Sequence, residues 1–252
     1  ARFEQRLGFR IEKRALELIG ESVKAKYPSL VSGDRLRNEL MLALKEEKPE
    51  KIFLRLKRLG CLGYFIPPAK ISAAVFARAR KNPLKRRDTP QLAVNLLCLV
   101  EGMNAEEIAQ FCARLNMPSE TKKLLKHAGG NAKTVSSKLA ASRPEQAYID
   151  LLSSDYPDAF LAYLASFGAK TAHIAGRFLD GRAQKPLVTG GDLKQLGLKE
   201  GPVYSELLKK IEAARMSGKV KSRKEALLYI GRTGCNGSVT GEKQRFGGSP
   251  SL

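Results

Sequence analysis

The dominant feature of this 252-residue chain is a succession of short apolar patterns with helical spacing, bounded by residues that start or stop helices. Residues 13–26, for example, place Leu16, Ile19 and Val23 on one face. No stretch alternates convincingly over more than four residues, so we expect no strands. The pattern predicts an all-α fold, built as an elongated array of short helices joined by short loops.

Capping residues and prolines mark where these helices begin and end. Asn104 with Glu107, and Ser222 with Glu225, have the spacing of a capping box, although the motif is defined for Ser or Thr. Proline suits the first turn of a helix and glycine the position after its end. These rules predict helix starts at Ser32, Pro49, Pro144 and Pro202 and helix ends at Gly60, Gly168 and Gly218.

Changes in composition divide the chain into segments. Residues 64–70 carry two adjacent prolines, residues 182–186 (RAQKP) have the composition of a linker, and residues 231–252 hold six glycines with almost no apolar content. No internal repeat has a fixed period. We predict a neck-like helical domain at 1–64, a helical body at 65–186, a helical tail at 187–230 and a disordered terminus at 231–252.

The charge balance points to a polyanionic partner. The chain has 45 Lys and Arg against 25 Asp and Glu, a formal charge of +20, and the excess is spread over most of its length. Distributed basicity suits a long nucleic acid better than a merely solvated surface. Aromatic residues make up only 7% of the chain, too few for a base-stacking platform. The composition therefore favours a nucleic acid that is not bound by base stacking.

Several classes of protein are disfavoured. No apolar run approaches the roughly 18 residues of a membrane span, and no leader opens the chain, so we expect a cytoplasmic protein. Cys61, Cys98, Cys112 and Cys235 match no zinc or redox spacing, which favours buried thiols in a reducing compartment. The close carboxylate pairs (46 with 47, 106 with 107, 155 with 158) fall on predicted helix faces or turns. We therefore expect no metal site and no catalytic residue.

Two stretches carry a resemblance to a known family. The opening ARFEQRLGFRIEK, with SGDRLRNEL at 32–40, and residues 188–227 together resemble the neck and tail of class II tRNA nucleotidyltransferases. That superfamily includes CCA-adding enzymes, A-adding enzymes and bacterial poly(A) polymerases. Asp34 and Leu36 stand where the family usually has Glu and Ile. Among the matched positions are Arg2, Phe3, Ser32, Glu39, Thr189, Asp192, Gly201 and Pro202.

The resemblance implies a division of labour. In this family the chemistry lies in an N-terminal head with a glycine-rich segment and an Asp-x-Asp pair for two metal ions, and neither occurs in this sequence. The chain is thus expected to be a headless fragment that by itself transfers no nucleotide and holds no cofactor. The full enzyme would use Mg²⁺ with ATP or CTP. The implied partners are that head domain and the acceptor stem and T-arm of tRNA.

Basic residues beside the matched motifs are the candidate phosphate contacts. An i,i+4 pair between Arg35 and Glu39 is an equally good structural interpretation of that arginine. The sequence Arg86-Arg87-Asp88-Thr89 is similar to a head motif of the family but has the wrong spacing, so we interpret it as a basic loop. The predicted RNA-binding residues are Arg35, Arg37, Lys194, Lys209, Lys210 and Arg215.

Two alternatives remain open at this stage. A non-enzymatic helical nucleic-acid-binding module would have the same charge, and the Gly-Leu-x-x-Gly-Pro stretch at 197–202 is compatible with a helix-hairpin-helix that grips duplex DNA. A protein-interaction scaffold is the other alternative, and it predicts no nucleic-acid binding at physiological salt.

Overall fold

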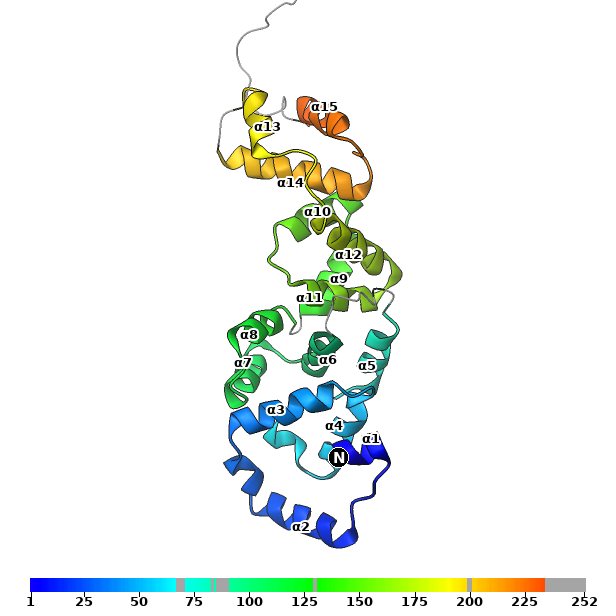
Figure 1. The fold of residues 1–252 in the computed structure, drawn as a ribbon, viewed down its shortest axis with the longest axis vertical. Coiled ribbons are helices and arrows are strands. Elements are labelled where there is room, and N and C mark those ends of the chain that lie inside the picture. Colours follow the sequence, from blue (N-terminus) through cyan, green and yellow to red (C-terminus); the bar gives the residue numbers. More distant parts are fainter. Residues whose placement is uncertain (67–70, 83, 85–90, 129–130, 199–200, 234–252) are drawn as a thin grey trace, which may run out of the picture.

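The computed structural model describes residues 1–66, 71–82, 84, 91–128, 131–198 and 201–233. Within these residues the chain forms helices and no strand, stacked into an elongated array with the first helices at one end and the last at the other (Figure 1). The predicted elongated all-α fold is confirmed. No helix among the described residues combines the length and the apolar composition that a membrane span requires.

The helices form three groups along the long axis of the molecule (Figure 1). The first end contains α1 (Arg2–Leu7), α2 (Lys13–Lys24), the 3-10 turn η1 (Tyr27–Leu30), α3 (Gly33–Leu44), α4 (Pro49–Arg58) and the 3-10 turn η2 (Leu62–Tyr64). The middle contains α5 (Ala73–Arg80), α6 (Gln91–Val100), α7 (Ala105–Arg114), α8 (Ser119–Lys126), α9 (Asn131–Ala141), α10 (Pro144–Leu152), α11 (Asp158–Leu164), the 3-10 turn η3 (Ala165–Phe167) and α12 (Ala169–Arg182). The last end contains α13 (Gly190–Gln195), α14 (Pro202–Ser217) and α15 (Arg223–Thr233).

The sequence signals for helix starts act as predicted at several positions. Pro49, Pro144 and Pro202 each open a helix, where a missing N–H costs nothing. The capping box of α7 is complete: the Glu107 N–H donates to Asn104 Oδ1 at 2.9 Å and the Asn104 N–H donates to Glu107 Oε2 at 2.8 Å. The Asn side chain therefore serves as well as the Ser or Thr of the motif.

Other boundaries differ from the prediction by a few residues. The helix predicted for 13–26 ends at Lys24, because Lys26 adopts a left-handed φ of 56°. At Ser222 only half of the predicted capping box forms, since the Glu225 carboxylate accepts from the N–H of Lys221 at 2.8 Å. Helix α15 runs to Thr233, past the predicted order boundary at 231. The predicted disorder of 234–252 and the basic loop at 86–89 lie outside the described residues.

The main hydrophobic core is organised around α6. Seven of its ten residues, 94–100, are buried, which is the pattern of a helix enclosed on all sides. It packs against α3, α5 and α11, and so joins the first end of the molecule to the middle. The buried Asn95 is satisfied because its Nδ2 donates to the Leu44 carbonyl at 2.8 Å and its Oδ1 accepts from Gln91 Nε2 at 3.0 Å.

A second core lies in the last end, and α14 belongs to both. Ala213 and Met216 enter the main core, whereas Leu207, Ile211 and Ala214 pack with residues of α13 and α15 in the second. Helix α14 also packs against α10. The main core contains residues on both sides of the predicted division at 64–65. The predicted domain boundaries therefore stay a prediction.

Gly33, the first residue of α3, allows that helix to touch the end of α7. A Cβ at this position would overlap the carbonyl oxygen of Arg114, a backbone atom that no side-chain rotation can move. We therefore expect Gly33→Ala to lower the free energy of unfolding by about 1–3 kcal/mol, the usual cost of overpacking. Urea unfolding followed by circular dichroism measures this change.

Gly20 provides the matched control for this substitution. It lies inside α2, and a Cβ there would meet nothing within 4 Å. Gly20→Ala should leave stability unchanged or raise it by up to about 1 kcal/mol, because alanine is the better helix former. Equal effects of the two substitutions would contradict the assignment of Gly33 to a close backbone contact.

Candidate nucleic-acid interface

The two predicted arginines of α3 have different surroundings. Arg35 is exposed, and no ion pair joins it to Glu39 in the described part of the chain. Arg37 instead faces the end of α7: its Nη1 pairs with Asp34 Oδ1 at 2.8 Å and donates to the carbonyl oxygens of Leu115, at 3.3 Å, and Asn116. Arg37 thus ties α3 to α7, while Arg35 keeps its guanidinium towards solvent.

The matched residues of α1 lie at the same end of the molecule. Arg2 lies over the ring of Phe3 at 4.9 Å and its Nη1 is 3.8 Å from Glu46 Oε1. Phe3 is exposed by 54%. Helix α1 is joined to α4 by Arg55, whose guanidinium contacts Glu4 at 2.9 and 3.1 Å and lowers the pKa of that carboxyl. Ser32 is the residue that precedes α3, and Glu39 is exposed on the same helix.

In the last end, Thr189 and Asp192 fold the matched motif into a structural clasp. The Thr189 N–H donates to Asp192 Oδ2 at 2.7 Å and its hydroxyl donates to the same oxygen at 2.9 Å. Arg223, the first residue of α15, pairs with the other carboxylate oxygen. These contacts, the backbone hydrogen bond first, lower the pKa of Asp192 to about 2. The clasp thus connects α13 to α15.

The predicted phosphate contacts of the last end also divide into two kinds. Arg215 on α14 contacts Glu212 Oε2 at 2.6 Å, Gln184 Oε1 at 2.8 Å and the Gly181 carbonyl at 3.0 Å, and is 11% exposed. Its guanidinium is held by the fold. Lys210 is exposed, Lys209 Nζ donates to Ser153 Oγ at 3.3 Å, and Lys194 lies on the exposed face of α13. Gly201 and Pro202 form the start of α14.

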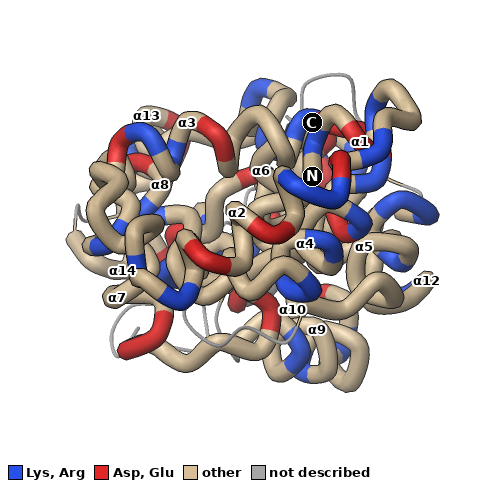
Figure 2. The backbone as a smooth tube through the Cα atoms, turned by 90° about the horizontal axis from the view of Figure 1, so that it is seen from below, with Lys and Arg blue, Asp and Glu red and all other residues tan. Residues whose placement is uncertain are grey.

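The structure does not bring the two groups of predicted contacts together. Arg35 and Arg37 lie on α3 and the others on α13 and α14, with the middle helices between them (Figure 1). Viewed along the long axis, Lys and Arg positions are distributed around the molecule with Asp and Glu positions between them (Figure 2). A ligand that touches both groups must therefore extend along the array.

A notch at the junction of the middle and the last end was missed by sequence reasoning. We call it the junction notch; its volume is about 510 Å³, and Arg177, Lys185, Arg215 and Lys221 are its basic lining residues. Lys185 lies in the stretch that we interpreted as a linker, and Lys221 follows the matched Gly-Lys-Val. The sequence shows basic residues in the loops that carry Lys185 and Lys221. It does not show that these loops lie side by side, because tertiary packing brings them together.

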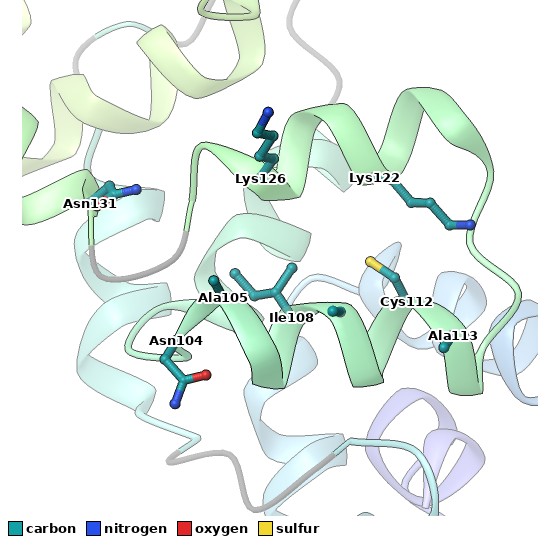
Figure 3. A pocket seen from close by; sticks show the side chains of 9 residues that line it. Asn104, Ala105, Ile108, Cys112, Ala113, Lys122, Lys126 and Asn131 are labelled. Carbon is teal, nitrogen blue, oxygen red and sulfur yellow. The ribbon is translucent and has the colours of Figure 1, made fainter.

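A second hollow, of about 650 Å³, separates α7 from α8 and the start of α9 (Figure 3). Its floor is apolar, formed by residues such as Ile108 and Cys112, and Lys122 and Lys126 of α8 stand at its edge (Figure 3). Burial raises the pKa of the Cys112 thiol, so this sulfur is protonated at neutral pH. Burial likewise raises the pKa of Cys98 to about 12, which fits a packing role.

No group of three or more His, Cys, Asp or Glu side chains in the described ranges could hold a metal ion. The close carboxylates have structural partners: Glu46 pairs with Arg2 and Arg6, and Asp158 pairs with Arg182 at 2.9 Å.

Comparison with known proteins finds relatives among the tRNA nucleotidyltransferases. No family model matches the chain. It is 29% identical over 244 residues to the A-adding tRNA nucleotidyltransferase of Geobacter sulfurreducens, an alignment that covers 90% of the chain and 28% of the relative. The chain is thus similar in sequence to a tRNA nucleotidyltransferase. The chain spans less than a third of that curated relative.

Solved nucleotidyltransferases share the fold of this chain. The Thermotoga maritima CCA-adding enzyme, solved in complex with tRNA, matches with a TM-score of 0.71 and 20% identity over 92% of the chain and 59% of that enzyme. A CCA-adding enzyme solved with ATP matches with a TM-score of 0.69 and 20% identity over 92% of the chain and 58% of its own. At 20% sequence identity, these structural matches show that the fold is shared and show nothing about function.

The clasp around Asp192 predicts how the stability of this chain depends on pH. The folded pKa of about 2 lies below the ordinary value of 3.8, so the clasp stabilises the fold above that ordinary value and is lost as pH falls towards 2. Asp192→Asn should therefore lower the urea midpoint at pH 7, and the difference from the wild type should shrink as pH falls from 4 to about 2.

Glu206→Gln is the control for this titration, because Glu206 is exposed on α14 and has no ion pair in the described part of the chain. Its urea midpoint should follow that of the wild type at every pH. A pH-independent difference for Asp192→Asn would show that the carboxylate charge does not hold the clasp.

Proposed function

We propose that this chain is the tRNA-holding C-terminal part of a tRNA nucleotidyltransferase that acts in tRNA 3′-end processing. The observation that carries the proposal is the alignment of 90% of the chain with an A-adding tRNA nucleotidyltransferase. The chain would hold the acceptor stem and T-arm of tRNA while a head domain adds nucleotides to the 3′ end. As a tRNA-processing protein it would work in the cytoplasm.

The physical character of the surface supports a backbone grip on RNA. An A-form duplex hides its base edges in a deep, narrow major groove, so it is bound through phosphates, 2′-hydroxyls and shape. Exposed cations such as Arg35 and Lys210 can neutralise phosphates at opposite ends of the array. A rigid, elongated scaffold is suited to reading the fixed shape of a folded RNA rather than its sequence.

The chemistry of the proposed enzyme belongs outside this chain. Mg²⁺ and the nucleotides ATP or CTP would be bound by the head, where they supply the activated phosphate and the charge that stabilises its transfer. The described residues contain no carboxylate cluster fit to hold metal ions, so no step of the transfer is assigned to them. Their task is to position the RNA end.

Binding of tRNA by the isolated chain should depend strongly on salt. With about four to six phosphates neutralised, log K should fall by roughly 3 to 5 for each tenfold rise in salt, because each contact releases a condensed counterion. Fluorescence anisotropy with labelled tRNA between about 0.05 and 0.3 M salt measures the slope. A flat profile would remove the electrostatic basis of the proposal.

Competition separates this function from its alternatives. Unlabelled tRNA should displace the probe at lower concentration than a DNA duplex of equal length, because the fit is to A-form geometry and 2′-hydroxyls. Equal competition by DNA would indicate a general nucleic-acid-binding module. Absence of binding at physiological salt would favour a protein-interaction scaffold.

A further inference from the structure

The junction notch is built from four segments that meet where the middle of the molecule joins its last end. The last turns of α12 supply Arg177 and Asp180, the connection after α12 supplies Lys185, the end of α14 supplies Arg215, and the turn before α15 supplies Lys221. Four basic residues and one acidic residue thus line a single hollow of about 510 Å³. This is a local excess of positive charge in a concave place.

Two of the cations are fixed by the fold. Arg177 Nε donates to the Met216 carbonyl at 3.0 Å, which orients its guanidinium along the turn at Gly218. Arg215 is held by the Gly181 carbonyl and by Glu212, as described above. Because Arg177 is already ordered, it presents positive charge to the notch without a further loss of side-chain entropy, whereas Glu212 offsets the charge of Arg215.

The other two cations are exposed at the mouth of the notch. Lys185 and Lys221 have their side chains in solvent, and neither forms an ion pair within the part of the chain that the structure describes. Three acidic groups lie nearby, and each has a contact: Glu212 pairs with Arg215, Glu225 Oε2 accepts from the Lys221 N–H at 2.8 Å, and Asp180 has a contact of its own. The lysines are therefore available to an anion that enters the notch.

We propose that the junction notch binds a phosphate group of an RNA backbone, with Lys185 and Lys221 as its direct contacts and Arg177 as a fixed neighbouring charge. A phosphate diester matches the notch because its exposed oxygens accept from several donors at once and its charge offsets the local excess. The proposal rests on the proposed function and adds a site that joins the middle helices to the last end.

The test compares two double variants that each remove two positive charges. The double variant Lys185→Ala with Lys221→Ala removes the two lysine side chains that are proposed to contact the phosphate. Lys122→Ala with Lys126→Ala removes two exposed lysines from α8, on the rim of the other hollow. Binding of tRNA is measured by anisotropy at several salt concentrations, with thermal unfolding as a check that all variants fold.

The notch variant should bind tRNA about 10- to 100-fold more weakly at about 0.1 M salt, with a salt slope smaller by about one to two. The α8 variant should change much less. Lys185→Arg with Lys221→Arg should retain most of the affinity, because arginine keeps the charge and donates to phosphate.

Each remaining outcome has a distinct meaning. If the notch and α8 variants lose the same affinity from a wild type that binds tRNA, the notch is not a phosphate site, while the proposed function stands. If the wild type itself does not bind tRNA, the proposed function fails and the notch loses its proposed ligand.

Discussion

The structure depends on a hydrophobic core that runs along an elongated molecule. In the middle, α6 is enclosed by α3, α5 and α11, so the first end cannot move relative to the middle without exposing apolar surface. Further on, α14 buries one face in the main core and another in the second core. Because α14 packs in both cores, it connects the middle of the molecule to its last end. The core therefore fixes the distance between groups of cations on well-separated helices.

The positive charge of this chain serves two purposes that the structure separates. Some cations hold helices together, as Arg37 holds α3 to the end of α7 and Arg215 holds α14 to the end of α12. Others, such as Arg35, Lys185 and Lys221, project into solvent. Only the second kind is available to an RNA at no cost to the fold, and such residues also occur in the middle, as Lys122 and Lys126 on α8 show.

The helical architecture could be predicted from the sequence because its signals are local. Pro49, Pro144 and Pro202 open helices through the geometry of a single residue, and Asn104 with Glu107 caps α7 within one turn. The binding surface could be predicted only in part. Lys185 and Lys221 line the same hollow because α12 packs against α14. Tertiary contacts also decide whether an arginine is bound by the fold, as Arg37 is by the Leu115 carbonyl, or is exposed to solvent.

The proposed function requires one RNA to lie along the array and to touch both of its ends. Acetylation of lysines with and without bound tRNA, read residue by residue by mass spectrometry, tests this claim directly. Bound tRNA should protect lysines in both the 1–64 and the 187–230 segments of the same one-to-one complex. Protection confined to one end of the molecule, or no protection at all, would contradict it.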